Sequence, residues 1–198
     1  MRTLTIAAVV ASTTALGAAG WYGYEASQQA RSEAEALAAV EAMYEVISGP
    51  AGEARDWDRF RSMFAEDGRL SLFTRGRPAG ADGTAAVAPR RITWTPDEYV
   101  ERAGTHMQTN AFYEEGVWSN VQMFGRMAHV FSTYETYNEP GGKAVARGIN
   151  SIQLVKDPAD EGAGWKVLLI VWDTEAPGRP VPAEMLPAGG RADVPTND

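Results

Sequence analysis

The sequence contains no cysteine, and this absence removes several kinds of chemistry at once. Disulfides, thiolate nucleophiles, cysteine-based metal sites and a lipid-modified N-terminal cysteine all require that residue. Only two histidines are present, His106 and His129, and neither belongs to a His-x-His or His-x3-His pair. Nor is there a Gly-x-Ser-x-Gly elbow, a Walker loop or a dinucleotide-binding fingerprint. We therefore predict no metal site and no cofactor.

Basic charge is also scarce. Eighteen lysines and arginines face 26 aspartates and glutamates, which gives a net charge of −8. An acidic surface repels phosphate backbones, so we predict no nucleic-acid partner. The sequence has no dense stripe of lysine and arginine, which argues against a protein that binds anionic membrane surfaces. The chain has 198 residues, enough for one domain with a sizeable core.

The N-terminus differs in character from the rest of the chain. After the positive start at Arg2, residues 3–19 are uncharged and rich in alanine and valine, and they end in small residues. This pattern predicts a signal peptide over residues 1–19, followed by a linker over 20–32. An uncleaved N-terminal anchor is the alternative, because the apolar character continues through Tyr24 and approaches the roughly 20 residues that span a bilayer. Either interpretation predicts a periplasmic or secreted protein, with membrane contact only if the segment is uncleaved.

Three helices are predicted before or between the strands. The first covers residues 26–47, with an apolar three-to-four-residue rhythm, and the Ser-Gly-Pro sequence at 48–50 ends it. The second covers 55–65. The third begins at Thr95, where Pro96 and Glu98 complete a capping box, and runs to about Met107.

Strands dominate the second half of the chain. The alternating and continuous apolar runs that predict them cover residues 69–74, 112–122, 125–137, 144–155 and 165–173. We expect a turn at 66–68, a long loop over 76–91, and a Pro/Gly-rich arm over 177–198. Helices that precede hairpin-connected strands, without βαβ alternation, predict an α+β fold.

Several segments together resemble the nuclear transport factor 2-like superfamily, in particular its SnoaL-like and exported branches. The residues that carry this resemblance lie at Tyr44–Gly49, 55–60, 64–70, 124–135, 147–154 and 172–173. The resemblance implies a cone-shaped, curved antiparallel or mixed sheet packed against three N-terminal helices and enclosing a pocket, here over residues 33–176. It implies no single function, because the superfamily includes enzymes and binding domains.

The resemblance also bears on candidate chemistry. In ketosteroid-isomerase-like members a carboxylate on the first strand acts as the base, and the matching position here is near Leu72, which cannot accept a proton. An acid on a late strand is matched by Asn150, whose amide can donate a hydrogen bond. A tyrosine on the first helix is matched by Tyr44. From the residues themselves, His129 in an apolar strand is either a general acid or base or a hydrogen-bonded core histidine.

Two further polar residues lie within the predicted late strands. Arg147 is flanked by apolar residues, so it either forms a structural ion pair or binds an anionic substrate group. Asp173 follows an apolar run and is placed to face a cavity. Our predicted catalytic residues are His129, Asp173 and Tyr44. Our predicted ligand-binding residues are Tyr44, Trp57, Phe60, His129, Arg147, Asn150 and Trp172.

Three functions are compatible with these features. The first is an exported domain that binds a small, largely apolar molecule in the cavity. The second is a cofactor-independent acid/base enzyme, such as an isomerase, dehydratase or hydrolase, that uses the late-strand polar cluster. The third is an interaction domain whose outer sheet face forms a homodimer.

Overall fold

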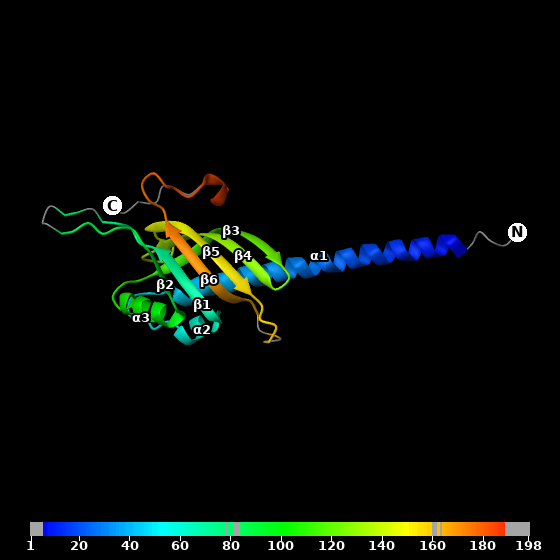
Figure 1. Ribbon diagram of the computed structural model, residues 1–198, viewed down its shortest axis with the longest axis horizontal. Helices are drawn as coiled ribbons and strands as arrows, with labels where there is room; N and C mark the ends of the chain where they lie inside the picture. Colours follow the sequence, from blue (N-terminus) through cyan, green and yellow to red (C-terminus); the bar gives the residue numbers. More distant parts are fainter. Residues whose placement is uncertain (1–5, 78, 81–83, 160–161, 163, 189–198) are drawn as a thin grey trace. The chain divides into compact units, whose positions relative to one another are not determined.

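The computed structural model describes residues 6–77, 79–80, 84–159, 162 and 164–188 (Figure 1). The chain divides into two compact units, residues 1–35 and 36–198, and each is considered by itself. Helix α1, Ile6–Ile47, begins in the first unit and ends in the second. Of the segment predicted as a signal peptide or anchor, residues 1–5 lie outside the described residues, and residues 6–19 are described only as helical backbone. In the part of the chain that is described, no helix combines the length and apolar character needed to cross a bilayer.

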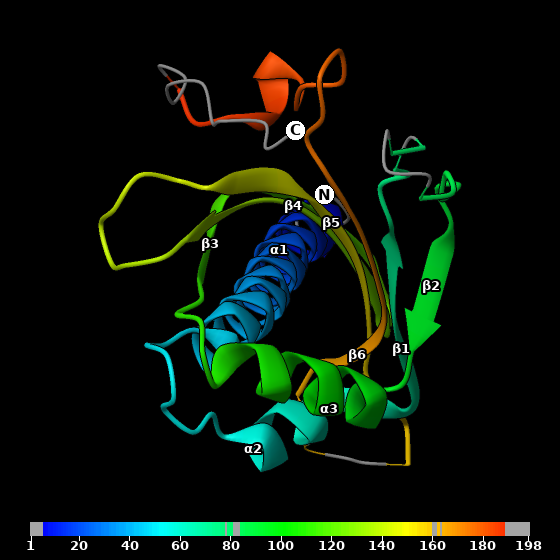
Figure 2. The same cartoon turned by 90° about the vertical axis from the view of Figure 1, so that its left-hand side faces the viewer.

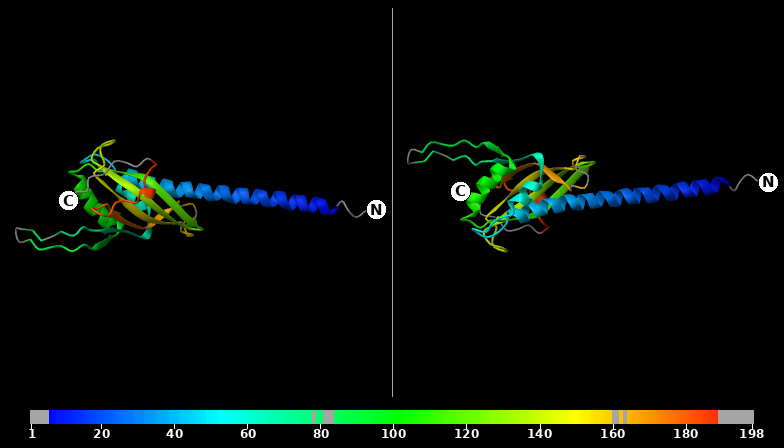
Figure 3. Two further views of the ribbon diagram at one scale, coloured as in Figure 1. Left: turned by 90° about the horizontal axis from the view of Figure 1, so that it is seen from above. Right: turned by 90° about the horizontal axis from the view of Figure 1, so that it is seen from below.

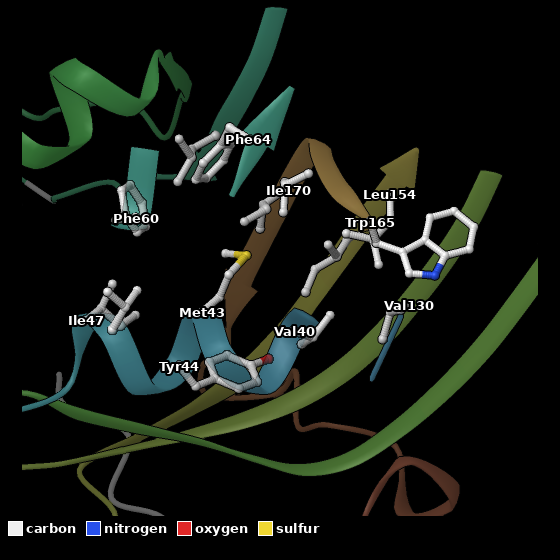
Figure 4. Packing of buried hydrophobic residues seen from close by; sticks show 14 of the residues in the cluster. Val40, Met43, Tyr44, Ile47, Phe60, Phe64, Val130, Leu154, Trp165 and Ile170 are labelled. Atoms are coloured by element: carbon white, nitrogen blue, oxygen red, sulfur yellow. The ribbon is translucent and has the colours of Figure 1, made fainter. Parts of the chain in front are cut away.

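The second unit begins with the last three turns of α1. Ala36, Val40, Met43, Tyr44 and Ile47 are buried and recur at three- and four-residue spacing, so they form one face of the helix. The helix ends at Ile47, as the Ser-Gly-Pro sequence predicted. In Figure 4 the side chains of this face point toward residues of the sheet and of the second helix.

Arg55 stabilises the segment that follows α1 by binding its backbone carbonyl groups. Its guanidinium donates hydrogen bonds of 2.6–3.1 Å to the carbonyl oxygens of Ile47, Gly49, Pro50 and Glu53. Carbonyls at a helix C-terminus lack partners within the helix, and a cation is favourable there. A side chain at Gly49 would collide with this guanidinium, because its Cβ would lie 2.7 Å from Arg55 Cζ.

Helices α2, Trp57–Ser62, and α3, Pro96–Met107, complete the helical layer. Asp56 caps α2, and the helix is shorter than the expected 55–65. The reason is that Phe64 already pairs with Val167 in the sheet, so the chain is extended through the predicted turn at 66–68. The capping box of α3 is confirmed, because the Thr95 hydroxyl accepts from Glu98 N–H and the Glu98 carboxylate accepts from Thr95 N–H.

Replacing Thr95 by alanine is expected to lower the free energy of unfolding by about 1 kcal/mol, since one helix-end N–H loses its acceptor. Thr105→Ala in the same helix is a matched control, because Thr105 only donates to the Glu101 carbonyl one turn earlier. Chemical denaturation of both variants measures the difference. Equal costs at the two positions would show that the capping box contributes nothing.

Six strands form one sheet in the order β2-β1-β6-β5-β4-β3. Their bounds are Phe64–Phe73 for β1, Arg91–Trp94 for β2, Tyr113–Phe124 for β3, Met127–Tyr137 for β4, Ala146–Val155 for β5 and Lys166–Thr174 for β6. Strands β1 and β6 are parallel and the other neighbours are antiparallel. Strand β2 was not predicted. The sheet is curved and unclosed, and Figure 2 shows it bending around the last turns of α1, which belong to the same unit. The predicted α+β fold, with helices followed by a curved mixed sheet, is confirmed.

The chain after β6 returns across the convex face of the sheet. Val181 is buried there, its N–H donates to Glu175 at 2.7 Å, and the Thr133 hydroxyl donates to the Met185 carbonyl at 2.7 Å. A short 3-10 helix, Ala183–Met185, lies in this segment. The described part of the predicted arm is therefore bound to the sheet, and residues 189–198 lie outside the described residues.

Candidate functional site

A cavity of about 320 Å³ lies between α1, the helical layer and the concave face of the sheet. Its walls are mostly aliphatic and aromatic side chains, with a few polar groups. The lining residues are Val40, Met43, Tyr44, Ile47, Phe60, Leu70, Tyr99, Phe112, Glu114, Tyr134, Thr136, Ala146, Asn150, Ile152, Ile170, Trp172 and Thr174. Several of them, including Met43, Tyr44, Phe60 and Ile170, are seen together in Figure 4. An apolar pocket with a small number of placed polar groups is the usual form of a small-molecule site.

The polar groups form one hydrogen-bonded chain across the cavity wall. The Asn150 amide on β5 donates to Tyr44 Oη at 3.1 Å and to Glu114 Oε1 at 3.5 Å. Tyr44 in turn donates to Ser132 Oγ at 2.9 Å, and Ser119 donates to the same oxygen at 3.1 Å. Tyr44 is thus hydrogen-bonded to Ser132 and Asn150, which follow it in the sequence by 88 and 106 positions.

Glycine at position 116 makes room for Tyr44. A Cβ built on Gly116 would lie 2.9 Å from Tyr44 Cε2 and 3.4 Å from Ser132 Oγ. Any larger residue would push the tyrosine ring away from β3. Glu114 lies two residues earlier on the same strand, and Phe112 directly precedes the strand; both line the cavity.

Glu114 places a carboxyl group in the wall of the cavity. Its carboxyl group is surrounded by apolar walls, and burial raises its pKa to about 8, while the hydrogen bond from Asn150 lowers it slightly. The carboxyl is thus mostly protonated at neutral pH. A protonated carboxyl donates one hydrogen bond, whereas a carboxylate only accepts. Within the described residues the only hydrogen bond to this side chain is the long one from Asn150.

Tyr99 supplies a second polar group to the cavity. Its ring stacks on Phe60, with ring centres 5.1 Å apart and planes 21° apart. Burial raises the pKa of Tyr99, and the nearby Glu114 charge raises it further, so the phenol stays protonated. No residue in the described ranges forms a hydrogen bond with its hydroxyl. Tyr99 therefore retains a donor for a molecule in the cavity.

Four of the predicted site residues meet at this cavity: Tyr44, Phe60, Asn150 and Trp172. Trp57 does not line it, because its ring packs edge-on against Phe60 from outside, with centres 5.8 Å apart. The first strand presents Leu70 to the cavity. Glu114 is the one carboxyl group among the described lining residues.

His129 lies on the opposite face of the sheet. Side chains alternate along β4, and Ser132 and Tyr134 face the cavity, so His129 faces outward. Its Nε2 atom lies 2.9 Å from Ser151 Oγ, and its ring borders a separate hollow with Gln122 and Gln153. The structure does not bring His129 to the cavity, which removes it from any chemistry there.

Arg147 and Asp173 also point away from the cavity. Arg147 Nε and Nη2 donate to Glu135 Oε1 at 2.9 and 2.8 Å, and Nη1 lies 3.7 Å from Glu175. Arg147 is thus engaged in a buried ion pair, the structural alternative considered for it. Asp173 pairs with Arg179 at the surface. Neither residue has its side chain at the cavity wall.

Glu114 and Tyr99 line the cavity but were not among the predicted site residues. The signal for Glu114 was its two-residue spacing from Phe112 in a predicted strand, which puts it on the apolar side. In the described part of the chain no three histidine, aspartate or glutamate side chains come close enough together to hold a metal ion.

Comparisons with known proteins give the fold but no closer identity. No family model and no curated protein matches the chain. Among solved structures, a protein of unknown function with a cystatin-like fold from Nostoc punctiforme aligns with a TM-score of 0.50 and 14% identity, covering 72% of this chain and 90% of its own. A candidate ketosteroid isomerase from Parabacteroides distasonis aligns with a TM-score of 0.43 and 13% identity, covering 67% of this chain and 82% of its own. The first of these matches shows that the chain has a cystatin-like fold, the fold of nuclear transport factor 2-like proteins.

Proposed function

We propose that this domain binds a small, neutral, largely apolar molecule that carries one carbonyl or hydroxyl group. The observation that carries this proposal is that Glu114 and Tyr99 line one apolar cavity, where burial raises the pKa of the Glu114 carboxyl to about 8 and keeps the Tyr99 phenol protonated. Aliphatic and aromatic walls favour apolar ligands, and the two donors favour a ligand with a hydrogen-bond acceptor. An anionic ligand is disfavoured, because the described residues that line the cavity include no lysine or arginine.

A matched pair of probes tests this proposal. 2-Acetylnaphthalene and 2-ethylnaphthalene share the ring system and the two-carbon substituent, but only the first has a carbonyl oxygen that accepts a hydrogen bond. We expect the acetyl compound to bind about tenfold more tightly near pH 6.5, by the contribution of one or two hydrogen bonds. Near pH 9.5 the advantage should shrink, because ionised Glu114 no longer donates.

Two variants separate the roles of charge and shape. Glu114→Gln keeps an N–H donor at every pH, so its preference for the acetyl compound should persist near pH 9.5. Glu114→Leu lacks a donor and should lose most of the preference while still binding the ethyl compound. Calorimetry measures all the affinities. Failure of both probes to bind would contradict a binding cavity, and equal affinities in the native protein would contradict the polar group's role.

Acid/base catalysis is the second candidate, and the same observation favours it. A carboxyl group with a pKa near 8 exchanges protons readily at neutral pH, as a general acid or base must. Glu114 then takes the role first predicted for His129. The test is the exchange of the methyl protons of 2-acetylnaphthalene in D₂O, followed by NMR. Acceleration that disappears in Glu114→Gln would support catalysis, and exchange at the rate of free solution would leave binding alone. From the sequence we also propose that residues 1–19 direct export and that the domain belongs to the SnoaL-like branch. The proposed role of the cavity does not depend on either.

A further inference from the structure

Strand β3 is a long edge strand without the usual protection against pairing. It is the last strand of the sheet, so only one of its sides bonds to a neighbouring strand, β4. Natural proteins protect such edges with short strands, lysine, proline or bulges. Residues 116–125 contain no charged residue and no proline, although 22% of the chain is charged. A bulge follows Gly116, and from Trp118 to Phe124 the strand then pairs with β4 without interruption.

The opposite edge of the sheet is protected. Figure 2 shows β2 at that edge and β3 at the other. Strand β2 has four residues, and Pro89 and Pro96 lie within two residues of its ends. Figure 3 shows the described part of the loop between β1 and β2 extending beyond the rest of the sheet. Of the two edges, β3 is therefore the one that offers a long, uninterrupted strand.

The turn between β3 and β4 determines which backbone groups of β3 are already bonded. Gly125 and Arg126 form a two-residue turn, so Phe124 and Met127 flank it as a hydrogen-bonded pair. Bonded and non-bonded pairs alternate along an antiparallel ladder, so every second residue before Phe124 also bonds to β4, as far as the bulge. On the other side of β4, the Lys156 N–H donates to the Arg126 carbonyl at 2.9 Å, which agrees with this alternation.

The intervening residues of β3 direct their N–H and C=O groups away from β4. They are Ser119, Val121 and Met123. In the described part of the chain these outward groups have no hydrogen-bond partner. Nearer the start of the strand the outward side is closed. Phe112 and Gly49 exchange two backbone hydrogen bonds of 2.7 and 3.0 Å. The Glu114 N–H donates to Ser48 Oγ at 2.9 Å. We call the open part, residues 118–124, the β3 edge.

We propose that two copies of this chain pair through their β3 edges in antiparallel order, with Val121 of both copies at the two-fold axis. In this register residue 119 of one copy pairs with residue 123 of the other. The three outward N–H groups of each copy then donate to the three outward carbonyl groups of the other. A contact in which both copies use the same surface closes on itself, so the product is a dimer with one continuous sheet.

The side chains of the β3 edge are complementary to themselves in the same register. Trp118 lies opposite Phe124 of the second copy, and Asn120 lies opposite Gln122. These four residues alternate along the strand and share its outer face. Phe124 is 78% exposed in the single chain, and an aromatic ring directly opposite stabilises such a pair. Shifting the register by two residues would place Phe124 opposite Asn120 or a glycine instead.

Charge also favours a second copy at this surface. The net charge of −8 makes two copies repel each other, so the uncharged segment 116–125 is a surface at which they can approach. A strand from a different protein would have to supply an aromatic ring at each end of the segment and amides between them. The β3 edge itself supplies this pattern when it is reversed.

Sedimentation equilibrium of the full chain from about 1 to about 200 µM tests the proposal, because interfaces of small area associate in this range. We expect a monomer–dimer equilibrium. Asn120→Lys with Gln122→Lys puts lysine opposite lysine at two places and should weaken association about tenfold or more. Asn120→Lys with Gln122→Glu puts lysine opposite glutamate and should keep association within about threefold of the native value. Both positions are exposed and neither lines the cavity, so the second double variant also controls for folding.

The absence of cysteine allows a second readout of the register. Chains with Asn120→Cys and chains with Gln122→Cys, mixed under mild oxidation, should form disulfide-linked dimers faster than either variant alone. The N-terminal segment is the same in every variant, so differences between variants report on β3. A native protein that stays monomeric would overturn the proposal and leave the edge to a strand from a different protein. Equal association of the two double variants would also overturn it, because the copies would then meet at another surface, such as the outer face of the sheet. Open-ended aggregates in place of a dimer would contradict the closed two-fold pairing.

Discussion

The free energy of unfolding is expected to fall as the pH rises from about 5 to about 9, and Glu114→Gln is expected to remove most of that fall. In the folded protein Glu114 keeps its proton until the pH nears 8, whereas in the unfolded chain it ionises near its ordinary pKa of 4.5. Between these values the folded state binds one more proton than the unfolded state. Raising the pH therefore favours unfolding, and the loss is complete above pH 8.

The size of this effect follows from the shift in pKa. At about 1.36 kcal/mol per pKa unit, the full shift from 4.5 to about 8 would correspond to about 5 kcal/mol, and the partial exposure of Glu114 to solvent reduces this to roughly 2–4 kcal/mol. Glutamine has nearly the same shape and keeps the contact with Asn150. Urea denaturation at a series of pH values measures the difference between the native protein and the variant. Glu115→Gln is the neighbouring control, because Glu115 is exposed and should shift stability by less than about 0.5 kcal/mol. Parallel pH profiles for native protein and Glu114→Gln would contradict the assignment.

Arg147→Met is expected to cost about 3–5 kcal/mol, the second large effect. Glu135 is 1% exposed, and Arg147 gives it two hydrogen bonds. Without the guanidinium, a buried carboxylate loses its counter-charge. For a domain of this size the melting temperature should fall by about 10 °C.

The surface pair of Arg179 and Asp173 provides the matched control. Both side chains are more than a third exposed, so Arg179→Met should cost less than about 1 kcal/mol. The double variant Glu135→Gln with Arg147→Met should recover part of the loss, because it leaves no buried charge. Thermal unfolding of the three variants measures these costs. Equal losses for the two arginine variants would show that the buried pair is not what stabilises this face.

Much of the fold was predictable from local patterns. The end of α1 at Ile47, the caps at Asp56 and Thr95, and strands β3 to β6 follow from residue spacing and from proline and glycine. The elements that were missed depend on partners distant in the chain. Phe64 is extended because it pairs with Val167. Strand β2 exists because Arg91–Trp94 completes the edge of the sheet beside β1.

The site was harder to predict, because residues were judged one strand at a time. Polar residues in apolar strands were taken to face the cavity, but a strand has two faces and a one-residue step changes the face. Among the predicted strand residues, Asn150 lies on the cavity side, whereas His129, Arg147 and Asp173 lie on the opposite side. Tyr44, on α1, also lines the cavity. Glu114 is adjacent to Glu115, and the sequence alone does not distinguish which of the two glutamates is enclosed. Only the position of β3 beside α1 shows that the first of them is enclosed.

Direct titration of the Glu114 carboxyl is the most decisive measurement. Protein labelled with ¹³C at the glutamate side-chain carboxyl gives one NMR signal per residue, and the signal missing from Glu114→Gln identifies position 114. We expect a midpoint near pH 8, with the carboxyl protonated at neutral pH. A midpoint near the ordinary value of 4.5 would mean that Glu114 is hydrated and ionised, and the proposed donor of the cavity would not exist.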